Sequence, residues 1–210
     1  MTSRWVKSLR GAVTFVAISV ALVTGVADAD VIGTAAASRD AAVKAIAATQ
    51  QDALVAGDKL REKNGRCIIC TIILIQNETG HDLKLGTSKD WAGHIGTVAF
   101  PATLHAGQTG VVLHVHTSGT PTGSVGAVVY TLTGSDGKSY DVALAWSTRY
   151  SGSNATRTTI QAAGAPWDWS SIENNMTSDY SRASNTGASS TSTTGPGSSP
   201  VAVFNISVPK

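Results

Sequence analysis

Residues 126–147 of the chain read GAVVYTLTGSDGKSYDVALAWS. The run Gly134-Ser135-Asp136-Gly137 has the residue types of a tight turn, and it lies between two apolar segments, Gly126–Leu132 and Ser139–Ser147. Strand side chains alternate between two faces, and the second segment places three apolar residues on one of them: Val142, Leu144 and Trp146. This stretch therefore predicts a β-hairpin with one buried face.

Similar strand patterns extend to both sides of the hairpin. Residues 71–76 are mostly apolar on both faces, residues 111–117 alternate, and residues 202–208 alternate again near the C-terminus. Several short strands separated by turns predict a mainly-β fold, a sandwich over residues 66–210. Within it, residues 181–199 consist largely of Ser, Thr, Gly and Pro, and this composition predicts a flexible loop.

The first 29 residues differ from the rest of the chain. A positive start with Arg4, Lys7 and Arg10 precedes an apolar run over residues 11–27, and small residues follow in Ala27-Asp28-Ala29. This pattern predicts a cleaved secretory signal peptide over residues 1–29 and a secreted protein. A transmembrane anchor is the alternative, but the apolar run is short for a bilayer core.

Residues 30–65 form an Ala-rich helical segment in this interpretation. The helix is predicted over residues 35–63, and it ends at Asn64-Gly65, which is a common helix stop. One hypothesis is a helix docked on the sandwich, which the pattern favours. The other is an amphipathic helix that detaches and enters a membrane.

The charge of the chain limits the classes of molecule that it can be expected to bind. Charged residues make up 14% of the chain, against about 25% in average globular proteins. The predicted signal peptide holds three of the sixteen Lys and Arg residues and one of the fourteen acidic residues, so thirteen of each remain. A mature chain without net charge has no general attraction for nucleic acid. Membrane binding would then depend on specific headgroup contacts and on aromatic side chains.

The chain contains two cysteines, Cys67 and Cys70, at the start of an apolar run. In an extended strand, positions three apart point to opposite faces, so a strain-free disulfide is not expected there. Two buried small residues are the favoured interpretation. A disulfide bridge, a redox motif and half of a metal site remain as alternatives.

Candidate catalytic groups are sparse. His114 and His116 share one strand face, which could hold a metal, but a half-exposed strand face is the simpler interpretation. The sequence contains no GxSxG, P-loop or HExxH motif, so we expect no enzyme activity and no cofactor. Four N-glycosylation sequons are present, and they begin at Asn77, Asn154, Asn175 and Asn205.

Aromatic residues form the most suggestive group. Trp146 and Tyr150 lie where a predicted strand ends, and Trp167, Trp169 and Tyr180 follow in loop-like sequence. Tryptophan and tyrosine suit the membrane interface, and they also stack on sugars or on choline-type cations. Core packing is the alternative, most of all for Trp146.

The same stretches resemble the actinoporins. The resemblance rests on residues 122–130, on the turn Ser135-Asp136-Gly137, on Ala145-Trp146-Ser147 and on the last strand, residues 204–208. Residues 89–94, which include Trp91, and residues 113–119 resemble more closely the small jasmonate-induced proteins of plants and nakanori-like fungal proteins. Together these stretches span roughly residues 30–210.

The resemblance implies an actinoporin-like β-sandwich with an N-terminal helix and one short flanking helix. It implies binding to sphingomyelin or another phosphocholine-type lipid, with pore formation and oligomers on membranes as an extension. Carried over from the resemblance, Ser147, Tyr150 and Tyr180 correspond to the headgroup site. The aromatic pattern adds Trp167 and Trp169 to this predicted site, with Trp91 and Trp146 as further candidate contacts. The chain departs from the actinoporin pattern in residues 151–157 and at Arg149. Two other functions remain open: a soluble stress or defence protein, and a carbohydrate-binding, lectin-like module.

Overall fold

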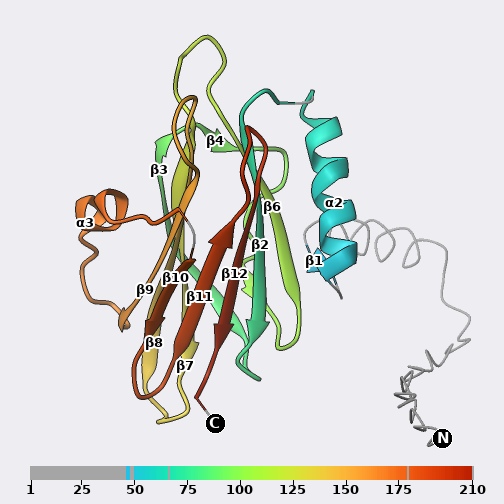
Figure 1. Cartoon of the computed structure of the whole chain (residues 1–210). Helices are drawn as coiled ribbons and strands as arrows, with labels where there is room; N and C mark the ends of the chain where they lie inside the picture. The colour runs from blue at the N-terminus through green and yellow to red at the C-terminus, as the bar shows by residue number, and fades with distance from the viewer. Residues whose placement is uncertain (1–45, 48–49, 66, 179, 210) are drawn as a thin grey trace, which may run out of the picture.

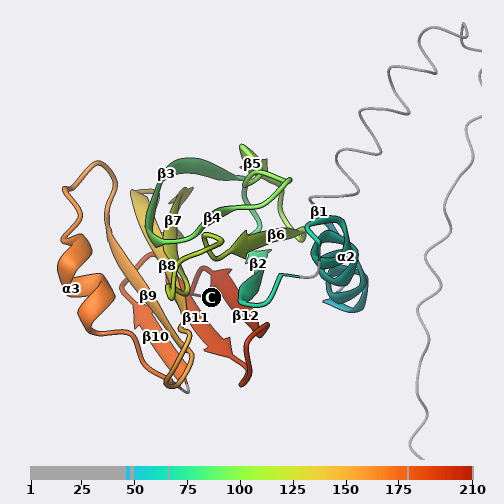
Figure 2. The ribbon, with the colours of Figure 1, turned by 90° about the horizontal axis from the view of Figure 1, so that it is seen from above.

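The structure is a computed structural model of the chain, and it describes residues 46–47, 50–65, 67–178 and 180–209. The predicted signal peptide and the first part of the predicted helical segment lie outside the described residues. The described part consists of two packed β-sheets with one helix against each outer side (Figures 1 and 2).

Sheet A has seven strands in the order β1-β6-β2-β12-β11-β10, with β4 paired to β6. The strand β12 runs parallel to β2, and the other pairs are antiparallel. Their bounds are β1 Ile46–Ala47, β2 Cys70–Glu78, β4 His94–Ile95, β6 Thr109–Val115, β10 Tyr180–Ser184, β11 Ser189–Thr194 and β12 Val201–Ser207.

Sheet B has five strands in the order β5-β3-β7-β8-β9. Their bounds are β3 Leu83–Ala92, β5 Thr103–Leu104, β7 Ser124–Thr133, β8 Ser139–Thr148 and β9 Ala155–Ala162. The predicted hairpin is confirmed as β7–β8, whose register runs from Ser124 opposite Thr148 to Thr133 opposite Ser139. Gly137 in its turn has φ 76°, a conformation that favours glycine.

The core lies between the two sheets. Alternate residues of each strand point inward, and the largest fully buried side chains include Trp146, Tyr130 and Phe204. The expected mainly-β sandwich with an N-terminal helix and a short flanking helix is therefore confirmed.

The helix α2 (Gln50–Lys63) packs on the outer face of sheet A. Ala53 and Leu60 are buried against the outward-facing side chains of β2 and β6. Gly57 permits this close approach, because a Cβ atom there would lie 2.5 Å from Ile72 Cγ2. The predicted helix is confirmed over residues 50–63 and stops at Gly65 with φ 76°, but it is wrong at residues 46–47, which pair with β6.

The predicted flexible loop over residues 181–199 is wrong, because this stretch contains most of β10 and all of β11. Its inward-facing hydroxyl groups find partners in sheet B. Thr158 Oγ1 donates to Ser190 Oγ (2.6 Å), and Ser192 Oγ donates to Thr156 Oγ1 (3.1 Å). A polar strand can therefore be ordered without large apolar side chains.

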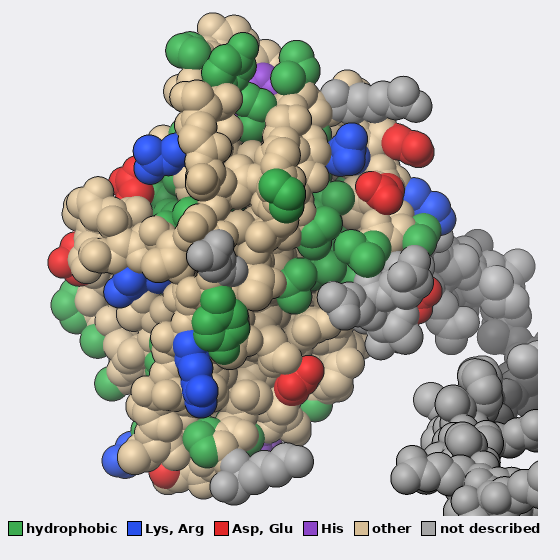
Figure 3. All heavy atoms as spheres, viewed as in Figure 1, with side chains coloured by type: hydrophobic (Ala, Val, Ile, Leu, Met, Phe, Trp, Pro, Cys, Tyr) green, Lys and Arg blue, Asp and Glu red, His purple; other side chains and the backbone are tan. Residues whose placement is uncertain are grey.

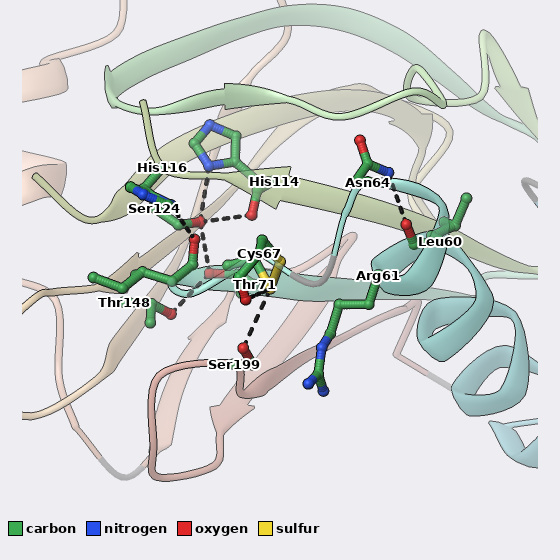
Figure 4. Close-up of a disulfide and its surroundings, with 12 residues drawn as sticks. Leu60, Arg61, Asn64, Cys67, Thr71, His114, His116, Ser124, Thr148 and Ser199 are labelled. Carbon is green, nitrogen blue, oxygen red and sulfur yellow. Dashed lines mark hydrogen bonds between the residues drawn. A yellow bond between two sulfur atoms is a disulfide. The ribbon is translucent and has the colours of Figure 1, made fainter. Parts of the chain in front are cut away.

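The two cysteines form a disulfide, which corrects the favoured interpretation of two unbridged residues (Figure 4). Only Cys70 belongs to β2, and residues 68–69 bend before the strand begins. The alternation of an extended strand does not apply to a bend, and the two Cα atoms lie 5.9 Å apart, within the usual range for a bridge.

Candidate functional site

Three tryptophans gather on the outer side of sheet B. The ring centroids of Trp91 and Trp169 are 6.2 Å apart with an interplanar angle of 76°, and those of Trp167 and Trp169 are 5.8 Å apart at 31°. Each of the three side chains is partly exposed. We name this group, Trp91, Trp167 and Trp169, the tryptophan cluster.

The sheet beneath the cluster is built from small residues. Ala127 and Val129 of β7 and Ala143 and Ala145 of β8 point outward, and they are buried under the segment that carries α3 (Trp169–Asn174). Small side chains let this segment lie close to the sheet, and Ile172 anchors it with 4% exposure. The three tryptophans are partly buried and pack against this apolar cluster between α3 and sheet B.

The start of α3 is fixed by a cap. The carboxylate of Asp168 accepts a hydrogen bond from the backbone N–H of Ser171 (2.9 Å). Asp168 lies between Trp167 and Trp169 in the chain, so the cap also holds the backbone on both sides of it. The relative positions of the two rings are therefore set by local structure.

A positively charged side chain, that of Arg157, lies close to the outer face of sheet B. Arg157 of β9 is paired in register with Ala145, which packs in the cluster's floor. Arg157 Nη1 donates to the carbonyl of Asn175 just after α3 (2.8 Å), while its Nε is buried and has no hydrogen-bond partner among the described residues. Arg157 is not among the site residues predicted from the sequence. The signal that could have found it is its place at an outward-facing position of a strand.

The other predicted site residues do not join the cluster. Ser147 is on β8 but only 3% exposed, and its Oγ accepts a hydrogen bond from Arg149 Nε (3.3 Å). Tyr150 is 69% exposed in the loop between β8 and β9. Tyr180 is 52% exposed on β10 of sheet A. Its neighbour Ser181 accepts a hydrogen bond from the N–H of Thr158 in sheet B, so alternation points Tyr180 away from the interior.

Trp146 belongs to the core. Its side chain is 0% exposed and packs against Phe100 and His114, with ring centroids 6.0 Å and 5.1 Å away. The expectation of a ligand contact at Trp146 is therefore wrong, and the alternative of core packing is confirmed.

His114 is also buried, so the expected half-exposed face is wrong at this position. Its Nδ1 lies 2.8 Å from Ser124 Oγ, and its Nε2 lies 3.1 Å from an oxygen of Asp90. This order resembles a Ser-His-Asp triad, but Ser124 is 0% exposed, so a substrate cannot reach it. Thr71 Oγ1 extends the network, at 2.8 Å from both Ser124 Oγ and Thr148 Oγ1.

This network, buried except for Asp90, joins the two sheets, because Thr71 and His114 belong to sheet A and the other members belong to sheet B. Burial lowers the pKa of His114 from 6.5 to about 4, even though the nearby Asp90 carboxylate acts in the opposite direction. The imidazole is therefore neutral at physiological pH and serves as a hydrogen-bonding link.

Two negative findings concern the described residues alone. No group of three or more His, Cys, Asp or Glu side chains is arranged to hold a metal ion. No helix in the described part is long and apolar enough to cross a membrane.

The asparagines of the four sequons differ in their exposure to solvent. Asn77 and Asn154 are buried, and each amide nitrogen donates to two backbone carbonyls. Asn175 is exposed at the end of α3. Asn205 is only partly exposed within β12. Glycosylation itself stays a prediction.

Fold and site together define a two-sheet β-sandwich with a surface cluster of tryptophans and no metal-binding group among the described residues. The model of the Nakanori-like protein family matches residues 23–206, and the chain belongs to this family.

Two individual proteins illustrate the relationship. The chain is 38% identical over 120 residues to a 23 kDa jasmonate-induced protein of Hordeum vulgare, a match that spans 53% of this chain and 56% of the relative. The chain thus covers little more than half the length of this relative. The crystal structure of the lipid binding protein Nakanori superposes with a TM-score of 0.68 at 17% identity, covering 83% of this chain and 85% of that one. At this identity the second comparison shows a shared fold.

Proposed function

We propose that this chain binds the phosphocholine-type headgroups of membrane lipids, such as sphingomyelin, through the tryptophan cluster. The observation that carries the proposal is the gathering of three partly exposed indole rings at one place on the surface. Two of these rings, Trp91 and Trp169, are nearly perpendicular. Rings in this edge-to-face arrangement pack against each other, and a quaternary ammonium group is attracted to the negative face of a ring that stays exposed.

Arg157 supplies the second half of such a site. A phosphocholine headgroup carries a phosphate beside its ammonium group, and a guanidinium group binds phosphate through paired N–H donors. Arg157 Nε is buried, so the donors that this side chain offers to a ligand come from its terminal Nη groups, one of which already donates to Asn175. The neighbouring carbonyl of Asn175 holds the guanidinium near α3.

Two further observations support this proposal. The family includes a protein whose crystal structure is described as that of a lipid binding protein. A disulfide is expected in an oxidising compartment, and together with the signal-like sequence of residues 1–29 it supports a secreted protein that meets lipids outside the cell. We propose a binding function without catalysis, since the one serine–histidine–aspartate arrangement described above is buried.

Liposome co-sedimentation tests the proposal. The protein from Asp30 onward is mixed with vesicles with and without sphingomyelin, and the Trp169→Ala variant is compared with wild type. Loss of one cation–π contact should weaken binding by about tenfold. Tyr180→Ala is the matched control, because it removes an exposed aromatic side chain from the other sheet. Equal pelleting of wild type and Trp169→Ala would contradict the proposed site.

Pore formation is a further step of the same proposal. It would require α2 to leave sheet A and expose the apolar surface around Ile72 and Leu74. Dye release from the sphingomyelin vesicles measures this step separately from binding. Binding without leakage limits the function to lipid recognition.

The jasmonate-induced relative supports a second candidate, a defence protein that acts in solution. If wild type pellets with no vesicle composition, this soluble function takes precedence. A lectin-like function would instead appear as binding to a glycan array.

A further inference from the structure

The sequence contains four asparagines in N-glycosylation sequons, and the structure distinguishes them by the state of the side-chain amide. They are Asn77, Asn154, Asn175 and Asn205. A glycan is attached to the amide nitrogen, Nδ2, which carries two hydrogens and loses one of them when the new bond forms. An acceptor in the folded protein must therefore have one hydrogen to spare, and its nitrogen must face solvent.

Asn77 and Asn154 meet neither condition. Asn77 is 1% exposed, and its Nδ2 donates to the carbonyls of His81 (2.7 Å) and Leu104 (2.8 Å). Asn154 is 8% exposed, and its Nδ2 donates to two carbonyls in the loop between β11 and β12. Both hydrogens are used at each position, so a glycan would leave a carbonyl without its donor and would find no room in the fold.

Asn205 lies in the middle of a sheet. It belongs to β12, where it is paired with Thr191 of β11 on one side and with Gln76 of β2 on the other. Its Oδ1 is buried and has no hydrogen-bond partner among the described residues. Sequons that accept a glycan lie in surface loops, because the transferase must reach the backbone around the asparagine. The regular pairing of β12 therefore argues against Asn205.

Asn175 meets both conditions. It is exposed, and it directly follows the last residue of α3. Its Nδ2 donates to the carbonyl of Ser171 (2.8 Å), while its second contact, with Ser171 Oγ, is 3.5 Å and longer than a usual N–H···O bond. One hydrogen of this amide can therefore be replaced by a glycan, and the shorter hydrogen bond to α3 can stay.

The surroundings of Asn175 also suit a bulky attached group. The helix α3 projects from the side of the sandwich in Figures 1 and 2, and its segment forms the left edge of the molecule in Figure 3. Thr177, the third residue of the sequon, is exposed as well. Because α3 has six residues, Asn175 is about 9 Å along the helix axis from Trp169. A glycan there would stand beside the tryptophan cluster and leave it open.

From these observations we propose that Asn175 is the one N-glycosylation site of the folded protein. In the transfer, Nδ2 forms a bond to the anomeric carbon of an oligosaccharide that is carried on a polyprenyl pyrophosphate. The bond between that carbon and the pyrophosphate oxygen breaks, polyprenyl pyrophosphate leaves, and Nδ2 gives up one proton. The transfer takes place in the secretory pathway, so this inference rests on the proposed secretion. It does not depend on lipid binding.

Expression of the full chain in cultured eukaryotic cells tests the inference. The secreted protein is treated with the enzyme that removes N-linked glycans and leaves aspartate in place of each acceptor asparagine, so peptide mass spectrometry identifies the site. Asn175→Gln removes the acceptor and keeps an amide. Thr177→Ser is the matched control, because serine also completes a sequon and keeps a hydroxyl where Thr177 Oγ1 donates to the carbonyl of Tyr180.

We expect secreted wild type and Thr177→Ser to carry a glycan at Asn175 alone, and Asn175→Gln to carry none. Secreted wild type without a glycan at Asn175, or with one at any of the other three asparagines, would overturn the inference and leave secretion standing. A glycan still present on secreted Asn175→Gln would overturn it in the same way. Retention of unglycosylated wild type in the cytosol would overturn the proposed secretion together with this inference.

Discussion

The buried His114 makes stability depend on pH in a defined interval. In the folded chain its imidazole stays neutral down to about pH 4, because burial lowers its pKa from 6.5 more than the Asp90 carboxylate raises it. In the unfolded chain the same group takes up a proton near its ordinary pKa. Below pH 6.5 the unfolded state therefore binds more protons, and the folded state loses stability as the pH falls.

The size of the effect follows from the two pKa values. Between pH 7 and pH 5 the free energy of unfolding should fall by about 2 kcal/mol through this residue alone, and the loss should continue until about pH 4. The pKa values of the Asp82 and Asp136 carboxyls are lowered from their ordinary value, because His105 and Tyr140 respectively hydrogen-bond to them.

Urea unfolding at pH 7 and pH 5 measures this dependence. The matched variant is His114→Gln, which keeps a polar side chain at the position but cannot titrate there. It should be less stable than wild type at pH 7 and should lose about 2 kcal/mol less on going to pH 5. If wild type and His114→Gln lose the same free energy between the two pH values, His114 is not the group responsible.

Three further predictions concern the stability of the fold: a closely packed glycine, the disulfide and a buried amide. Urea or thermal unfolding measures the change in the free energy of unfolding for each. Gly126→Ala should cost about 2 kcal/mol, because the new Cβ would lie 2.7 Å from a buried indole ring, whereas Gly195→Ala has open space and should be nearly neutral. Replacing Cys67 and Cys70 by Ser together should lower stability by about 2 kcal/mol, and an equal free energy with and without reductant in wild type would count against the bridge. Asn77→Ala should cost about 3 kcal/mol, since the buried amide donates to two carbonyls; a loss below 1 kcal/mol would contradict its role.

Local patterns predicted the parts of the fold that local interactions determine. The β7–β8 hairpin follows from a turn sequence between two alternating segments, so the sequence indicates it directly. The Ser/Thr strand β11 could not be predicted in this way, because its order depends on hydroxyl partners such as Thr158, which lies 32 residues away in the chain. The disulfide was missed because the bend before β2 is not visible in an apolar sequence.

The sequence predicted only part of the candidate site, because only part of the site depends on interactions between residues close together in the chain. Trp167 and Trp169 are two residues apart, so their proximity is local, and the prediction that they act together is consistent with their 5.8 Å separation. Trp91 joins them through the packing of α3 on sheet B, which no local pattern shows. Ser147 and Trp146 illustrate the reverse. The resemblance predicted Ser147 near a ligand and the aromatic pattern offered Trp146 as a further contact, but their strand buries both side chains.

The most direct test of the proposed headgroup site uses the indole N–H signals in NMR spectra of the nitrogen-15-labelled protein from Asp30 onward. That protein has four tryptophans: Trp91, Trp146, Trp167 and Trp169. On titration with soluble phosphocholine, the signals of the three cluster tryptophans should shift together with one dissociation constant. The signal of the buried Trp146 should stay in place and serves as an internal control. Absence of shifts in the cluster, or an equal shift at Trp146, would contradict headgroup binding at this site.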